Sequence, residues 1–195
     1  MPTWRLLQPT DYRRVPWKNG LGTTLDLATD APSDGVAWSW RFSLADVPTR
    51  AGFSEFSGID RHLAVLEGEG LTLERGQART AVPREGPAIL FAGEEAIVGV
   101  PIGSGVRDAN LMLDRRRWRG ELAIVRATDA RSVTLVRQLL LIHAASAESP
   151  IECKVGAQRI QLAQGCTLHA QEGVTLIAAA CTLVIAQLQP VGSPS

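Results

Sequence analysis

The sequence predicts an all-β protein with little helix, built from two stacked antiparallel β-barrels or sandwiches. Three observations support this fold class: apolar residues recur at every second position, turn residues separate the apolar runs, and the composition shifts near the middle of the chain. Alternation with a period of two is typical of strands that bury one face. Many short strands at regular spacing are typical of a β-sandwich or β-barrel.

The clearest strand lies within residues 37–44, where three aromatic residues and a leucine occupy one face and Arg41 lies with two serines on the other. Residues 62–66 and 71–73 predict a β-hairpin, because a Glu-Gly-Glu-Gly turn separates them. Further strands are expected at residues 89–91, 96–100, 122–126, 133–143, 158–162, 173–179 and 181–187. The run 133–145 is apolar enough to form a helix instead, which is the main alternative to an all-β fold.

The stretch 103–120 predicts the joint between the two units, because its composition shifts to Asp, Arg and Gly. We place the first unit, which holds a ligand pocket, at residues 1–110. The second unit, which shares strands with the first, is placed at residues 111–195. The basic run at residues 114–119 is short and isolated, so we interpret it as a solvated connector.

The composition indicates a folded protein without a strongly charged partner. Of its 195 residues, 45% are hydrophobic, which suffices for a packed core. Lys and Arg number 20 and Asp and Glu number 20, so the charge predicts neither nucleic acid nor a membrane surface as a partner. The N-terminal residues carry no apolar segment of signal-peptide length, so we expect a cytoplasmic protein. The oligomeric state stays open, with a homodimer as one option.

Four segments occur in an order that resembles a known family. They are PWKNGLGTT, WSWRFSLADV, FSEFSGIDRHLAVLEGEGL and GVRDANLML, and together they span roughly residues 15–113. They resemble the signatures of the HutD/Ves family, small bacterial proteins with a double cupin (bicupin, RmlC-like) fold. The resemblance implies a link to histidine utilization or stress response. It also implies that the chain binds a small catabolic metabolite, for which urocanate and an N-acylated glutamate are natural guesses.

A metal site is not expected in this chain. Many cupins hold a metal with two histidines one residue apart, a glutamate a few residues later and a third histidine in a second motif. Residues 53–62 contain only His62, next to Arg61, while His143 and His169 lack partners at ligand spacing. The three cysteines have no close pair and predict neither a disulfide framework nor a zinc site. We therefore expect no cofactor.

Without a metal, arginine is the residue suited to hold an anionic ligand, because its planar fork can donate two parallel hydrogen bonds to a carboxylate. Arg61 is the favoured candidate, since it lies where the cupin metal motif would lie. Two roles remain open for Asp60, which would either orient this guanidinium or cap a turn. Two interpretations of Arg41 remain open. If the aromatic face of its strand fills the core, Arg41 faces solvent; if both faces are covered, it points into a polar cavity.

The turn after Trp17 supplies two more candidates. Lys18 and Asn19 precede glycines, which permit backbone angles that other residues avoid, so an ammonium and an amide would be held at the barrel mouth. The alternative is an ordinary Asn-Gly turn; the family resemblance favours binding. Trp17 would act as a packing lid, and Phe53 would shape a wall of the pocket.

Asp108 and Asn110 alternate with apolar residues, and buried polar residues need partners. They either tie the two units together or line the pocket; we favour a structural role for Asp108 and leave Asn110 open. His62, with Asp60 or Glu55, is the acid–base pair that an enzyme would use.

Three functions follow. The first is a metal-free protein that binds a small anionic metabolite for sensing or regulation. The second is a metal-independent isomerase or hydrolase, and the third is a scaffold. No G-x-S-x-G elbow, P-loop or dinucleotide fingerprint is present in the sequence, so we expect a binding protein rather than an enzyme.

Overall fold

The computed structural model describes residues 3–17, 20–30, 37–84, 86–129, 131–178 and 180–192, and it is almost entirely β-structure. Nineteen strands in this part of the chain form four sheets, with one 3-10 turn at Pro9–Asp11. The all-β fold class is therefore confirmed. The ambiguous run 133–145 contains two separate strands rather than a helix. No helix of the described residues is long and apolar enough to cross a membrane.

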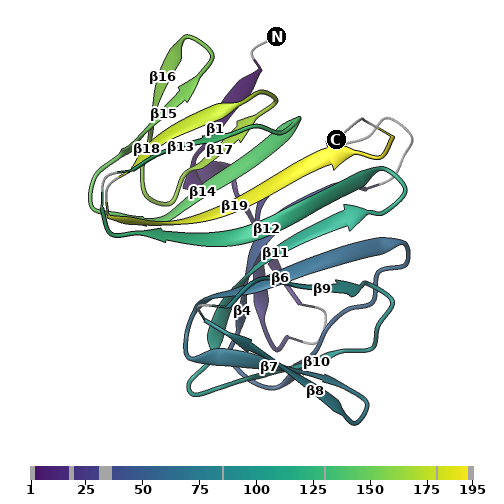
Figure 1. Cartoon of the computed structure of the whole chain (residues 1–195). Helices are drawn as coiled ribbons and strands as arrows, with labels where there is room; N and C mark the ends of the chain where they lie inside the picture. The colour runs from purple at the N-terminus through teal and green to yellow at the C-terminus, as the bar shows by residue number, and fades with distance from the viewer. Residues whose placement is uncertain are drawn as a thin grey trace. The chain divides into compact units, whose positions relative to one another are not determined.

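The chain forms two compact units (Figure 1). The first unit is Arg13–Trp118, and the second combines Met1–Tyr12 with Arg119–Ser195. In Figure 1 the purple N-terminal strand lies among the green and yellow strands of the second unit, because it pairs there with a strand far along the chain.

The first unit consists of a six-stranded and a four-stranded antiparallel sheet. Its strands are β2 (Arg13–Pro16), β3 (Thr23–Thr29), β4 (Trp40–Val47), β5 (Ala51–Gly52), β6 (Ile59–Glu67), β7 (Gly70–Arg75), β8 (Ala78–Pro83), β9 (Ile89–Ala92), β10 (Val98–Pro101) and β11 (Val106–Asp114). Their orders are β2-β3-β4-β11-β6-β9 and β5-β10-β7-β8. β11 therefore lies at the centre of the larger sheet, between β4 and β6.

The hairpin predicted for residues 62–73 is wrong in its pairing. β6 pairs with β11 and β9, whereas β7 pairs with β10 and β8, so the tight turn carries the chain from one sheet to the other. Gly68 makes this change of sheet feasible, because its φ is +97° and a Cβ there would lie 2.6 Å from the carbonyl oxygen of Gly105. The sequence pattern identified the turn but not the strands' partners.

Side chains from both sheets form the core of the first unit. Leu63 and Val65 on β6 pack with Leu71 and Leu73 on β7 in one buried cluster. Because alternate residues of a strand share a face, Arg61 lies on the same face of β6 as Leu63 and Val65. The core face of this strand therefore contains a cation between Ile59 and Leu63.

The second unit has the same layered plan but an apolar interior. Its strands are β1 (Trp4–Leu7), β12 (Trp118–Ala127), β13 (Arg131–Leu135), β14 (Leu139–Ala147), β15 (Ile151–Val155), β16 (Gln158–Leu162), β17 (Thr167–Ala170), β18 (Val174–Ala178) and β19 (Cys181–Pro190). They form sheets in the orders β1-β17-β14-β19-β12 and β13-β18-β15-β16. Buried aliphatic side chains and three free cysteines make up its core cluster.

The observed division between the units differs from the predicted one. A boundary at residue 110 would cut through β11, which pairs with β4 on one edge and with β6 on the other. The first unit ends at Trp118 instead. The predicted joint at 103–120 contains this central strand, in which the polar residues Asp108 and Asn110 are buried. At the end of β11, the buried Asp114 binds the guanidinium of Arg116 at 3.1 Å.

Replacing Leu63 with alanine should lower the free energy of unfolding by about 2–5 kcal/mol, because it leaves a cavity in the core of the first unit. Leu63 is fully buried, whereas Leu90 on the neighbouring strand β9 is 59% exposed. Leu90→Ala is therefore the matched control and should change the free energy by less than about 0.5 kcal/mol. Chemical denaturation of both variants measures the difference, and equal losses would contradict this placement of the core.

Candidate functional site

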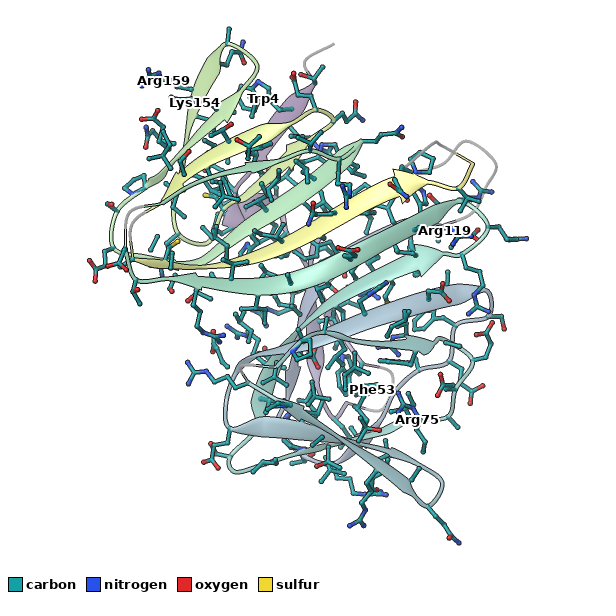
Figure 2. All side chains as sticks on the ribbon, viewed as in Figure 1. Trp4, Phe53, Arg75, Arg119, Lys154 and Arg159 are labelled. Carbon is teal, nitrogen blue, oxygen red and sulfur yellow. The ribbon has the colours of Figure 1, made fainter. Side chains whose placement is uncertain are left out.

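A cavity of about 400 Å³ lies in the first unit. Aromatic and aliphatic side chains supply much of its wall, and Figure 2 shows the labelled Phe53 inside this unit. The polar and charged residues that line it are Thr24, Arg41, Ser43, Ser54, Arg61, Asp108 and Asn110. Most of them come from three adjacent strands of the larger sheet, β4, β11 and β6.

Strand periodicity explains why these polar groups meet. Register places Asn110 of β11 opposite Ser43 of β4, and Met112 opposite both Arg41 of β4 and Arg61 of β6. These residues line the cavity, while the intervening Phe42 is fully buried on the other face of β4. Both faces of β4 are therefore covered, which decides between the two interpretations of Arg41 in favour of the cavity.

Arg61 is a buried cation with incomplete hydrogen bonding. It is 8% exposed, and the carbon at the centre of its guanidinium lies 5.0 Å, 5.1 Å and 5.9 Å from the ring centroids of Phe91, Phe53 and Phe56. Such cation–π contacts stabilise the charge in part. Burial lowers the pKa of Arg61 to about 10, with the Asp108 carboxylate opposing the shift and Arg41 adding to it. Arg61 therefore keeps its charge at neutral pH.

The donors of Arg61 have few acceptors. Nη1 donates to the backbone oxygen of Ser54 and Nη2 to Oδ1 of Asn110, each at 3.3 Å, and Nε has no hydrogen-bond partner among the described residues. A guanidinium offers five N–H donors. Leaving donors of a buried cation unsatisfied is costly. The site is therefore short of an acceptor.

Asn110 and Asp108 continue the hydrogen-bonded network that starts at Arg61. The Nδ2 of Asn110 donates to Oδ1 of Asp108, so the amide oxygen is turned toward Arg61. Asp108 is only 1% exposed. Burial raises the pKa of Asp108 to about 7, against the opposing effects of the Arg61 charge and the Asn110 hydrogen bond. The pKa of this buried carboxyl therefore lies far above that of an exposed aspartate.

Arg41 is the second cation of the cavity, but its charge is paired. Its Nε and Nη2 lie 2.6 Å and 2.5 Å from Oδ1 of Asp26, whose other oxygen binds Nη2 of Arg13 at 2.9 Å. Two arginines therefore share one buried carboxylate. The remaining positive charge adds to the potential that an anion would meet in the cavity.

Trp17 and Phe53 form one wall. The indole Nε1 of Trp17 donates to Oγ1 of Thr24 at 2.9 Å, and the two rings meet edge to face with centroids 6.3 Å apart. Glycines allow this close packing: a Cβ on Gly22 would lie 3.0 Å from the Trp17 indole, and one on Gly99 would lie 2.8 Å from the Phe53 ring. A residue larger than glycine at either position would therefore displace the aromatic wall.

The structure brings together five of the residues predicted for the site, namely Trp17, Arg41, Phe53, Arg61 and Asn110. His62 is half-buried and does not line the cavity, because the residue after Arg61 on a strand points to the other face. Lys18 and Asn19 lie outside the described residues.

Asp60 and Asp108 have roles other than those expected. Asp60 does not orient Arg61; its Oδ1 accepts from Nε of Arg115 at 2.9 Å instead. Asp108, for which we favoured a structural role, lines the cavity. The signal for Asp108 was its even spacing from Asn110 and Met112, which places all three on one face of β11.

The donor set of the cavity does not suit a divalent metal. Within the described part of the chain, no group of three or more His, Cys, Asp or Glu residues converges as metal ligands would. Asp108 is the one carboxylate among the described lining residues, and Arg61 places a positive charge beside it.

Sequence comparisons relate the chain to a bacterial family. The family model described as HutD matches residues 9–185. A 21.2 kDa protein in the hutC 3′ region of Pseudomonas putida is 32% identical over 163 residues, which is 83% of each chain. Protein Ves of Citrobacter koseri is 29% identical over 122 residues, covering 60% of this chain and 63% of that protein.

Solved structures share the fold. A conserved protein of Pseudomonas aeruginosa is 29% identical, with a TM-score of 0.84 over 95% of this chain and 98% of that chain. HutD from Pseudomonas fluorescens SBW25 is 25% identical, with a TM-score of 0.76 over 97% of this chain and 100% of that chain. The Escherichia coli pirin YhhW, in complex with nickel(II), resembles it in fold alone, at 10% identity and a TM-score of 0.67 over 96% of this chain and 100% of that chain.

Asp108→Asn should stabilise the protein more at pH 8 than at pH 5. The pKa of Asp108 is about 7 in the folded state and near 3.8 in the unfolded state. Between pH 3.8 and pH 7 the folded protein therefore holds a proton on Asp108 that the unfolded chain has lost, and the folded protein loses stability as the pH rises through this range. The gain in the free energy of unfolding from Asp108→Asn should be about 2–3 kcal/mol larger at pH 8 than at pH 5. Urea unfolding of wild type and variant at both pH values measures this.

Asp114→Asn is the control for this measurement. Its partner Arg116 lowers the pKa of Asp114, so its titration lies below pH 5 and its stability effect should be equal at the two pH values. A pH-independent effect of Asp108→Asn would contradict the burial of a titrating carboxyl in the cavity.

Proposed function

This chain belongs to the HutD family, and from that premise we propose that it binds a small carboxylate metabolite in the cavity of the first unit, in a sensing or regulatory role. The observation that carries the proposal is Arg61, a buried guanidinium whose Nε has no hydrogen-bond partner among the described residues. A carboxylate supplies the missing acceptors and the opposite charge together.

The shape of the site favours a small organic anion. A cavity of about 400 Å³ has the size of a small-molecule site, and its walls combine aromatic side chains with a few polar groups. Arg61 is held by Asn110 on one side and by phenylalanine rings around it, so its fork is preorganised before a ligand enters. The polar end of the ligand would meet Arg61, and its apolar body would meet Phe53 and Trp17.

Histidine catabolism is the context that best supports the choice of ligand. The Pseudomonas putida relative is encoded in the hutC 3′ region, and one solved relative bears the name HutD and was studied in a formate condition. Formate is itself a carboxylate. Urocanate and an N-acylated glutamate both carry a carboxylate of suitable size, and a cytoplasmic protein would meet both.

The alternative function is a metal-independent isomerase or hydrolase that uses the same cavity. One observation favours it: burial raises the pKa of Asp108 to about 7, the range in which a carboxyl can both accept and donate a proton. His62 does not line the cavity, so Asp108 is the acid–base candidate. Turnover of a bound carboxylate that is abolished in Asp108→Asn and kept in His62→Ala would support this alternative.

Arg61→Met should weaken carboxylate binding roughly 10–100-fold, because a charge-assisted hydrogen bond contributes about 1.5–3 kcal/mol. Methionine keeps a flexible apolar side chain among the phenylalanine rings, which limits the damage to packing. A thermal-shift screen with formate, benzoate, urocanate and N-formylglutamate identifies binders through a raised melting temperature. Isothermal titration then gives the Kd of wild type and variant.

Arg79→Met is the matched control, because Arg79 is a 75% exposed arginine of the same unit that does not line the cavity. It should bind as wild type does. Unchanged affinity in Arg61→Met, or no carboxylate that raises the melting temperature, would contradict the proposed function.

A further inference from the structure

Asp108 raises a question that carboxylate binding by itself leaves unanswered. An acidic group in an anion site repels the ligand when ionised, yet Asp108 lines the same cavity as Arg61 and is almost fully buried. It is also joined to Arg61 through Asn110, which accepts from the arginine and donates to the aspartate. Any change of charge on Asp108 is therefore felt at Arg61.

The charges that face Asp108 come from the two strands packed beside it. Arg61 lies on β6, and Arg41 and Asp46 lie on β4. The charge of Arg61 lowers the pKa of Asp108 and that of Asp46 raises it, while Arg41 lowers the pKa of Arg61. Arg41 is paired with Asp26 of β3 at 2.5 Å, and that carboxylate also binds Arg13.

Asp46 is paired in its turn. Its Oδ1 accepts from Nε of Arg107 at 2.7 Å, and its other oxygen lies 3.9 Å from Nη1 of Arg14. These pairs leave Arg61 and Asp108 as the two charges in the cavity that lack a direct ionic partner among the described residues. When Asp108 is ionised, the two balance each other across Asn110.

An anion that enters the cavity upsets this balance. It brings a second negative charge to Arg61 in surroundings of low dielectric constant, where an uncompensated charge is costly. Protonation of Asp108 restores neutrality, because the pair then consists of Arg61 and the ligand. The neutral carboxyl also gains an O–H that can donate to the bound carboxylate.

We infer that Asp108 takes up a proton from solvent when a carboxylate binds, so that the protein binds anion and proton together. This inference rests on the proposed function, since it concerns the same cavity. Asp108 is a positioning residue for Arg61 when ionised and a hydrogen-bond donor to the ligand when protonated. The burial that raises the pKa of Asp108 to about 7 places this exchange in the physiological range. The affinity of the protein for its ligand would thus fall as the pH rises above about 7.

Benzoate is a suitable probe, because its carboxyl titrates well below pH 6 and its ring matches the aromatic wall of Phe53 and Trp17. Calorimetric titration of wild-type protein at pH 6, 7 and 8 should show a Kd that is nearly constant below pH 7 and rises up to about tenfold per pH unit above it. Two buffers of different ionisation enthalpy, neither a carboxylate, should reveal uptake approaching one proton per benzoate at pH 8.

Two variants separate Asp108 from other titrating groups. Asp108→Asn should bind benzoate with a Kd independent of pH and without proton uptake. His62→Gln should keep both effects, since it replaces the titratable residue next to Arg61 on β6 but does not alter the lining of the cavity. Loss of the effects in His62→Gln, or their persistence in Asp108→Asn, would overturn the assignment to Asp108.

The wild-type titration decides the inference even if Asp108→Asn fails to fold. A Kd that does not change between pH 6 and pH 8, with no proton uptake, would overturn proton coupling and leave the proposed function intact. Wild-type protein that binds neither benzoate nor any other carboxylate at all three pH values would overturn both.

Discussion

The burial of one cation, Arg61, is the constraint on which the site depends. Its side chain leaves water to lie among phenylalanine rings, where it keeps its charge and donates only two long hydrogen bonds to the described residues. Removing a charge from water costs several kcal/mol unless partners replace the lost hydration. The surrounding residues replace it in part, through cation–π contacts and the amide of Asn110. The remaining deficit is the reason why a carboxylate is proposed as the ligand.

The two units show how one architecture yields two interiors. Both consist of antiparallel strands in paired sheets, and in both the strand period of two sorts side chains between faces. In the second unit the inward positions carry aliphatic residues and cysteines, which close the core. In the first unit some inward positions of β4, β11 and β6 carry polar residues instead, namely Arg41, Ser43, Asp108, Asn110 and Arg61. Side-chain polarity at a few positions therefore decides where the cavity lies.

Strand register matters as much as residue type in this cavity. Met112 of β11 lies opposite both Arg41 and Arg61, which sets the two cations on either side of the central strand. Each arginine then meets a different environment: Arg41 donates to the buried carboxylate of Asp26, whereas Arg61 donates to two neutral acceptors, the amide of Asn110 and the backbone oxygen of Ser54. The same residue type thus serves as a paired structural charge in one place and as a cation short of acceptors in the other.

Periodicity in the sequence determined the fold class, the strand that carries Arg41 and the turn after β6, because burial of alternate residues leaves a local pattern. The family resemblance and the position of the usual cupin metal motif predicted a site that includes Trp17, Phe53 and Arg61, and left the role of Asn110 open. Tertiary structure decided what lies across from each strand: β6 and β7 belong to different sheets, β11 is a central strand of the first unit, although it lies within the predicted joint, and Asp60 pairs with Arg115. It also decided that Asp108 shares the cavity of Arg61, because pairing between strands distant in sequence depends on contacts that no local pattern records.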